Sequence, residues 1–127
     1  MSTISIFLVE DSALIRTNLL AALEDLAPAK VIGFAESADE ACRSLRELSK
    51  SGGCDLVIVD ISLKFGSGLD VLRWVAASEL PFQTVLLTSY STPTIRAECW
   101  DLYGAHVFDR SREVDELINY CHELANA

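Results

Sequence analysis

Acidic side chains follow two apolar runs of the chain, and their positions suggest phosphoryl chemistry. Glu10 and Asp11 come after the run 3–9, and Asp60 ends the run 56–59. Three carboxylates that share one site cannot all stay ionised unless one is protonated or a cation compensates. Hard oxygen ligands with one open side suit Mg²⁺, which keeps several waters and shares a phosphate oxygen. A carboxylate shielded by Mg²⁺ can attack a phosphoryl group, so Asp60 is the candidate nucleophile.

Two candidate donors follow the later strands. Thr88 ends the run 84–88, and Arg110 comes just after the run 105–108. Charge that develops on phosphoryl oxygens in the transition state requires donors of this kind.

Each of these residues also has an ordinary interpretation. The acids would cap helices or loops, the threonine would be a β-branched strand residue, and the arginine would form a surface pair with Asp109. Because the candidates occur at four successive strand ends, a shared site is the better hypothesis; they are Glu10, Asp11, Asp60, Thr88 and Arg110.

Strands and helices alternate along the chain, and they must position these side chains. Strands are expected at 3–9, 31–35, 56–60, 84–88 and 105–108. Helices are expected after Ser12, after Ser37, over 69–81, from Pro93 to Tyr103 with Gly104 as a left-handed stop, and over 114–124. We therefore predict an α/β three-layer sandwich, a five-stranded parallel sheet in the flavodoxin-like order 2-1-3-4-5 with five helices. Its crevice lies between the first and third strands.

Composition narrows the class of protein. The 127 residues are 50% hydrophobic and 23% charged, as in one globular domain, and the net charge of −9 argues against direct nucleic-acid binding. No apolar run approaches the roughly 18 residues that span a membrane, so we expect a cytoplasmic protein with no membrane contact.

The cysteines and histidines show no metal-binding or redox motif. The cysteines lack C-x-x-C spacing and fall in apolar patterns, which predicts buried, reduced thiols at Cys42, Cys54, Cys99 and Cys121. His106 and His122 have no zinc-ligand spacing with them.

Taken in order, the motifs resemble those of the bacterial response-regulator receiver domain over essentially the whole chain. They are Phe7–Asp11, Val57–Asp60, Gly66–Leu72, Leu86–Tyr90 and Gly104–Ala105. Because the chain ends at Ala127, just after the expected fifth helix, we expect one receiver domain over residues 1–127, a stand-alone protein without an effector domain.

The resemblance also implies a role for each candidate. Glu10 and Asp11 would be the acidic Mg²⁺ pair and Asp60 the phosphoacceptor and metal ligand, with the backbone carbonyl of Ser62 as a further ligand. Thr88 would be the switch hydroxyl. The phosphoryl group would come from a histidine kinase or phosphotransfer protein, and the chain would act on itself, not as a turnover enzyme.

An output surface is expected on the fourth helix, fifth strand and fifth helix. It would contact a downstream protein or form a homodimer, with Trp100, Tyr103 and Phe108 as anchors. The alternative is that Trp100 and Phe108 are core residues.

Three positions depart from the family pattern. Arg110 replaces the usual lysine, with an interval from Gly104 that is one residue shorter, and arginine differs from lysine in geometry. The aromatic switch position falls on Phe108 or, with the shorter interval, on Val107. Lys64 replaces a frequent proline.

The departure at Arg110 keeps one alternative open, a receiver-like binding module that acts without phosphorylation. A flavodoxin is rejected because Glu10 and Asp11 would repel its phosphate. An aspartyl-nucleophile phosphatase is disfavoured because Ser62 stands where its general acid is needed, and because Asp60 is not on the first strand.

Overall fold

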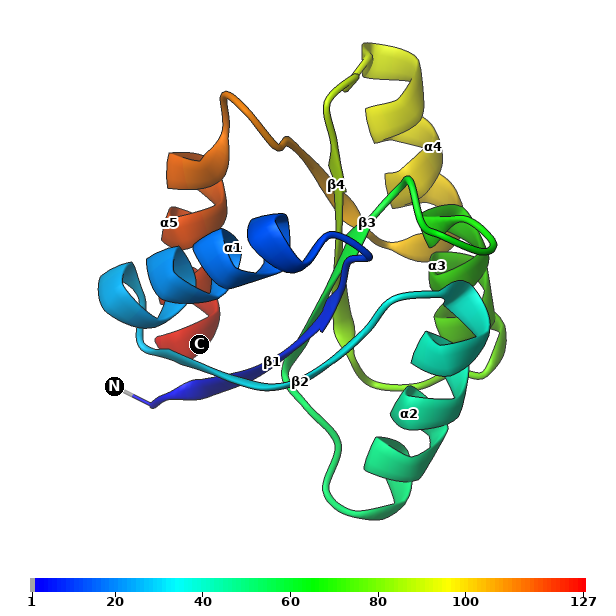
Figure 1. Cartoon of the computed structure of the whole chain (residues 1–127), viewed down its shortest axis with the longest axis horizontal. Coiled ribbons are helices and arrows are strands. Elements are labelled where there is room, and N and C mark those ends of the chain that lie inside the picture. The colour runs from blue at the N-terminus through cyan, green and yellow to red at the C-terminus, as the bar shows by residue number, and fades with distance from the viewer. Residues whose placement is uncertain (1) are drawn as a thin grey trace.

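The computed structural model describes residues 2–127, in which five strands alternate with five helices (Figure 1). The elements are β1 (Ile4–Val9), α1 (Ala13–Leu26), β2 (Ala29–Ala35), α2 (Ala38–Lys50), β3 (Leu56–Asp60), α3 (Gly68–Ala77), β4 (Gln83–Thr88), α4 (Pro93–Tyr103), β5 (His106–Asp109) and α5 (Val114–Ala125). Within the described residues, no helix combines the length and the apolar character needed to cross a membrane.

The strands form one parallel sheet in the predicted order β2-β1-β3-β4-β5. β3 is the central strand, paired with β1 on one side and with β4 on the other. All of its residues are buried, as a strand covered on both faces requires. The carboxyl ends of β1 and β3 therefore lie side by side.

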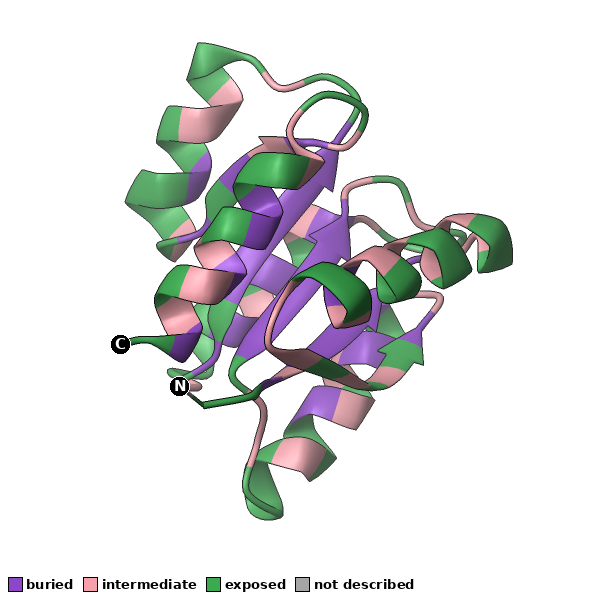
Figure 2. Ribbon diagram, turned by 90° about the vertical axis from the view of Figure 1, so that its left-hand side faces the viewer, coloured by how far each residue is buried: buried purple, intermediate pink, exposed green. Residues whose placement is uncertain are grey.

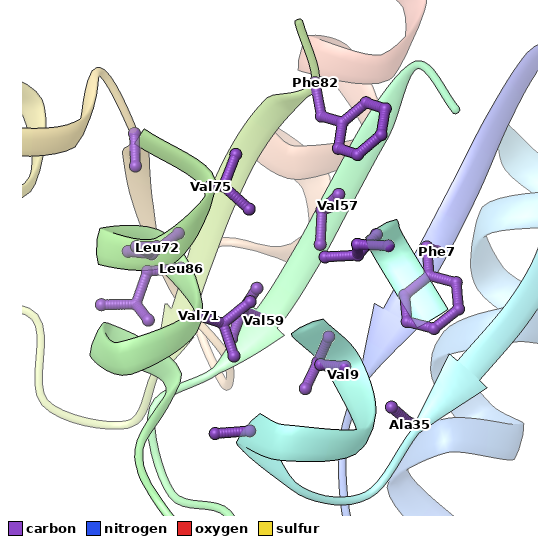
Figure 3. Close-up of a cluster of buried hydrophobic side chains, with 14 of the residues drawn as sticks. Phe7, Val9, Ala35, Val57, Val59, Val71, Leu72, Val75, Phe82 and Leu86 are labelled. Carbon is purple, nitrogen blue, oxygen red and sulfur yellow. The ribbon is translucent and has the colours of Figure 1, made fainter. Parts of the chain in front are cut away.

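Helices cover both faces of the sheet (Figures 1 and 2). The sheet therefore separates the hydrophobic core into two parts. Alternate strand residues such as Phe7, Val57 and Val59 pack with α2, α3 and α4 (Figure 3). Their neighbours Ile6 and Ile58 pack with α1 and α5 on the other face. The predicted three-layer sandwich is confirmed.

Several helix ends are set by the predicted capping residues. The Ser12 and Ser37 hydroxyls each accept a backbone hydrogen bond of 3.2 Å at the starts of α1 and α2. Pro93 occupies the first turn of α4, and Gly104 ends that helix in the left-handed region with φ 64°.

Some predicted boundaries and burial assignments were wrong. The third helix was expected to reach Pro81 but ends at Ala77. Two residues later, Glu79 takes a left-handed φ of 54°. All four cysteines are free, as predicted, but only Cys99 and Cys121 are fully buried. Burial raises the pKa of Cys121 to about 11, so it remains a thiol.

Candidate functional site at the carboxyl edge of the sheet

Asp60, Glu10 and Arg110 meet at the carboxyl edge of the sheet. Asp60 is the last residue of β3, Glu10 follows β1 and Arg110 follows β5. The two acids are 3% and 4% exposed, because both leave strands that are covered on both faces. The crevice expected between β1 and β3 therefore holds two buried carboxyl groups.

The guanidinium of Arg110 lies between the two acids. Its Nη1 donates a hydrogen bond to Asp60 Oδ2 and lies 3.6 Å from Glu10 Oε1. The Arg110 side chain is 32% exposed and that of Asp60 is 3% exposed. The carboxylate is therefore buried, whereas the arginine reaches solvent. Such charge-assisted contacts are stronger than neutral hydrogen bonds.

Backbone groups bind the remaining oxygens of the two acids. The N–H of Ser62 donates to Asp60 Oδ1 at 2.9 Å, and the N–H of Ser12 donates to Glu10 Oε2 at 2.9 Å. Each carboxyl group therefore has one oxygen fixed by the main chain and one directed toward Arg110.

The Glu10 carboxyl group keeps its proton at neutral pH in this arrangement. Burial raises the pKa of Glu10 from 4.5 to about 8, and a hydrogen bond with the Asp60 side chain adds to the rise. A smaller contribution comes from a hydrogen bond with Asp11, while the N–H of Ser12 acts in the opposite direction. One of the acids is thus protonated, which is one of the two ways of relieving carboxylate crowding.

Thr88 lies on the strand next to Asp60. Asp60 pairs with Leu87 in the register of β3 and β4, which puts Thr88 one residue further along. Its side chain is buried, and its Oγ1 accepts a hydrogen bond of 3.0 Å from the N–H of Tyr90. The Thr88 carbonyl accepts another, of 2.9 Å, from the N–H of Arg110. The two candidate donors are therefore connected through the main chain.

A glycine lets α3 start against the end of β3. A Cβ atom on Gly68 would overlap the Asp60 carbonyl oxygen and approach Val59 Cγ1 at 2.9 Å. The preceding residue, Ser67, forms a capping box with Asp70 that fixes the start of the helix. The close approach holds the backbone of Asp60 in place.

The donor atoms of the predicted metal site suit Mg²⁺, but Arg110 takes up the space between them. Glu10, Asp11 and Asp60 offer carboxylate oxygens, the ligands that Mg²⁺ prefers. Among residues 2–127, however, no group of three or more His, Cys, Asp or Glu side chains is arranged to hold a metal ion. The structure thus differs from the predicted convergence of three acids, because only Glu10 and Asp60 share a partner, and that partner is a cation of the chain.

Asp109 does not pair with Arg110, contrary to the ordinary interpretation of that pair. Its buried carboxylate accepts hydrogen bonds from the N–H and the hydroxyl of Ser111 at 2.9 and 2.8 Å, and its other oxygen lies 3.4 Å from Arg112 Nη2. These contacts, chiefly those from Ser111, lower the pKa of Asp109. Asp109 therefore shapes the loop after β5 and leaves Arg110 to the site.

A polar network that the sequence did not indicate links the loops after β4 and β5. Arg96 of α4 donates to the Val107 carbonyl at 2.6 Å, to Ser91 Oγ at 2.8 Å and to the carboxylate of Glu113. Glu113 also accepts a hydrogen bond of 2.8 Å from the N–H of Asp109. An arginine within a helical pattern carries no sequence signal for this role.

The expected output surface carries a row of aromatic rings. Trp100 is 56% exposed and lies 5.1 Å from the ring of His106, which lies 4.7 Å from Tyr120. Phe108 is half-buried against the same two rings, whereas Tyr103 packs on the core. His106 and Tyr120 were not predicted to belong to this row, because the sequence pattern does not distinguish them from other surface and core positions.

The two candidates for the aromatic switch position lie on opposite faces of the sheet. Val107 is buried in the core beneath α2, α3 and α4, and Phe108 packs against the core beneath α1 and α5. The face shared with α4 therefore carries a small aliphatic side chain at this point of β5.

Comparisons with known proteins agree on the family and on the fold. The family model described as response regulator receiver domain matches residues 6–121. The response regulator UvrY of Escherichia coli strain K12 is 25% identical over 116 residues, which are 91% of this chain and 51% of UvrY. The response regulator GacA of Pseudomonas syringae pv. syringae strain B728a is 29% identical over 85 residues, 67% of this chain and 38% of GacA. The chain thus spans about half the length of UvrY and a smaller share of GacA.

Solved structures show the same fold at low sequence identity. The receiver domain of the putative response regulator NarL from Mycobacterium tuberculosis superposes with a TM-score of 0.82 at 17% identity, covering 100% of this chain and 99% of that one. A LuxR-family two-component response regulator from Aurantimonas sp. SI85-9A1 gives 0.84 at 21% identity, covering 98% and 86%.

Proposed function

Because the chain belongs to the response regulator receiver domain family, we propose that it accepts a phosphoryl group on Asp60 in two-component signal transduction. The observation that most supports this role is the placement of Asp60, a buried carboxylate at the end of the central strand that has a second acid and a cation as neighbours. Such an environment favours a nucleophile that is shielded from water and compensated in charge.

The donor would be a phosphohistidine on a histidine kinase or phosphotransfer protein. A carboxylate oxygen of Asp60 attacks phosphorus, and the new O–P bond forms as the N–P bond of the phosphohistidine breaks. The histidine nitrogen leaves with the electron pair of that bond. Water later attacks the acyl phosphate and releases inorganic phosphate, so the chain acts on itself and turns over no separate substrate.

The oxygen atoms near Asp60 would hold Mg²⁺. Glu10, Asp11, Asp60 and the backbone carbonyl of Ser62 are the proposed ligands. The ion would supply positive charge that neutralises the phosphoryl oxygens.

Arg110 and Thr88 are the proposed contacts to the phosphoryl oxygens. The planar guanidinium of Arg110 can bind two oxygens at once, a geometry that lysine lacks. The Thr88 oxygen accepts from the N–H of Tyr90, which leaves the hydroxyl proton free to donate.

The output surface in this proposal is the face of α4, β5 and α5 that carries Trp100 and Phe108. Phosphorylation would shift a two-state arrangement of that face and change its affinity for a downstream protein or for a second copy. The net charge of −9 supports a protein partner rather than nucleic acid. A cytoplasmic location is part of the proposal.

A second candidate function is a binding module that works without phosphorylation. It is favoured by one observation, the engagement of both Asp60 and Glu10 by Arg110. On this hypothesis the ion pair is permanent, and the chain recognises its partner in one state.

Intact mass spectrometry after incubation with Mg²⁺ and acetyl phosphate separates the two functions. We expect the wild type to gain one phosphoryl mass and Asp60→Asn to gain none. Asp115→Asn, which changes an exposed aspartate of α5, is the matched control and should label like the wild type. If the wild type stays unlabelled while a control receiver is labelled, the binding module is the better account.

A further inference from the structure

Four aromatic rings form a row across one edge of the sheet. Strand β5 lies at this edge, and the His106 ring lies 5.1 Å from the ring of Trp100 in α4 and 4.7 Å from the ring of Tyr120 in α5. Phe108, the second ring of β5, lies 6.1 Å from Tyr120. Trp100 and His106 are exposed. The row therefore connects α4, β5 and α5 and leaves aromatic surface open to solvent.

A hollow beside the row contains carboxylates. It has a volume of about 340 Å³ and is lined by three of the rings and three polar side chains, namely His106, Phe108, Tyr120, Glu116, Asn119 and Glu123. Glu116 and Glu123 flank Tyr120 on one face of α5, and neither forms an ion pair with any residue of the range 2–127. Ring faces and carboxylates both attract positive charge, so the hollow suits a cation.

The charges around the row are unbalanced. Residues 93–125, which run from α4 to α5, contain three arginines and no lysine. Each of these arginines already forms an ion pair, and the pairs are Arg96–Glu113, Arg110–Asp60 and Arg112–Asp109. The exposed acids Glu98 and Asp101 of α4 add to the negative charge of the segment. The positive charge that complements this surface therefore has to come from a partner.

We propose that the row and its hollow bind an arginine-bearing segment of a partner protein. A guanidinium in the hollow stacks on the Tyr120 ring and pairs with Glu116 or Glu123, and the exposed Trp100 packs against an apolar side chain of the same segment. The planar guanidinium stacks on rings and binds a carboxylate through two N–H groups, which the ammonium of lysine does not do. The proposal rests on the proposed function, because it names the partner of the output surface.

The same charges disfavour a second copy of the chain as the occupant. A two-fold dimer places a surface against the same surface of its partner, so Glu116 and Glu123 would meet their own copies. Like charges that face each other across an interface cost free energy, and the paired arginines of residues 93–125 leave no lysine or arginine to offset them. A different protein with a basic segment is therefore the better fit.

Fluorescence anisotropy with short labelled peptides tests the chemistry of the partner. The probes are amphipathic peptides of leucine and arginine, of leucine and lysine, and of leucine and glutamate. We expect the arginine peptide to bind, the lysine peptide to bind about threefold more weakly, and the glutamate peptide not to bind. Lysine and arginine peptides of equal affinity, or no binding of the arginine peptide, would overturn the proposal.

A pair of double variants separates this surface from the overall negative charge. Glu116→Gln with Glu123→Gln should weaken the arginine peptide about fivefold, since two carboxylates of the hollow are lost. Asp25→Asn with Glu79→Gln removes two exposed acids far from α5 in the sequence and changes the net charge equally. This control should weaken binding less than about twofold. Equal losses in both double variants would show that the peptide follows net charge alone, against the proposal.

Trp100→Leu tests the aromatic part of the surface. Because Trp100 is 56% exposed, the variant should keep the thermal midpoint of the wild type while it binds the arginine peptide about threefold more weakly. An unchanged affinity would contradict the role of the row.

Sedimentation velocity in beryllofluoride and Mg²⁺ tests the second copy. We expect a monomer, and a dimer that is lost in Trp100→Leu would overturn the choice of occupant. Failure of the proposed function gives a different result, in which Asp60 takes up no phosphoryl group but the arginine peptide still binds and still depends on Glu116 and Glu123. Failure of the present proposal leaves Asp60 labelled and the peptide without that dependence.

Discussion

Arg96 of α4 and Glu113 at the start of α5 form a hydrogen-bonded ion pair that joins the loops after β4 and β5. Arg96 also lowers the pKa of Glu113, so the pair stays charged at neutral pH. Thr88 is the last residue of β4, and Arg110 is the first residue after β5. The pair thus ties the loops beside the site to α4, the helix that carries Trp100.

Arg96→Met should destabilise the chain by about 1 to 3 kcal/mol, because Glu113 and the Val107 carbonyl lose a charged donor. Urea unfolding followed by circular dichroism measures the loss. Arg43→Met, at an exposed position of α2, serves as the control and should fall within about 0.5 kcal/mol of the wild type. A similar small change for Arg96→Met would show that the network contributes nothing.

Stability in EDTA should fall as the pH rises toward 8. The pKa of Glu10 is about 8 in the folded chain and near 4.5 when unfolded, so the folded state binds the extra proton. The resulting stabilisation is complete below about pH 4.5 and is lost as the pH passes through about 8, with a slope of at most about 1.4 kcal/mol per pH unit.

Glu10→Gln has an amide that does not titrate, so it should remove the dependence of stability on pH between about pH 6 and 8. Urea midpoints across that range provide the measurement. Glu116→Gln, at an exposed site on α5, should keep the slope of the wild type. If Glu10→Gln and the wild type lose stability in parallel, the pKa of Glu10 is not raised.

Gly68→Ala should destabilise the chain by about 2 to 4 kcal/mol, because the new methyl group overlaps the Asp60 carbonyl and must push α3 from β3. Gly104→Ala meets no atom within 4 Å and suffers only from its φ of 64°, which costs about 1 kcal/mol. Thermal unfolding of both variants gives the comparison. A Gly68→Ala protein as stable as Gly104→Ala would contradict the close approach.

Trp100 should report the switch through its fluorescence. In a Trp74→Phe background it is the only tryptophan, and it lies 56% exposed beside His106. Beryllofluoride with Mg²⁺, a phosphoryl mimic, should change its emission, while Asp60→Asn should show no change. An unchanged spectrum in the Trp74→Phe protein would argue that this face does not respond to the site.

The sequence predicted the sheet because its strands carry a strong signal. The short run that ends at Asp60 has the length and the β-branched composition of a covered strand. The Gly104 stop and the Ser12 cap are local features of the backbone. The end of α3 was less predictable, since Glu79 adopts a left-handed φ with no glycine to announce it.

The candidate site was predictable in position but not in contacts. Alternation of strands and helices brings Glu10 and Asp60 to one edge whatever their side chains do. Arg110 could point to solvent, to Asp109 or to the two acids. Its direction depends on its rotamer and on the conformation of the neighbouring loops, and neither can be read from the local sequence. The ring contacts of His106 with Trp100 and Tyr120 have the same origin, because they join three elements.

Borohydride trapping tests phosphoryl transfer to Asp60 most directly. After incubation with Mg²⁺ and acetyl phosphate, borohydride reduces an aspartyl phosphate to homoserine, and peptide mass spectrometry locates the converted residue. We expect conversion at Asp60 and at no other aspartate. Conversion elsewhere, or none where a control receiver is converted, would contradict the assignment of Asp60 as phosphoacceptor.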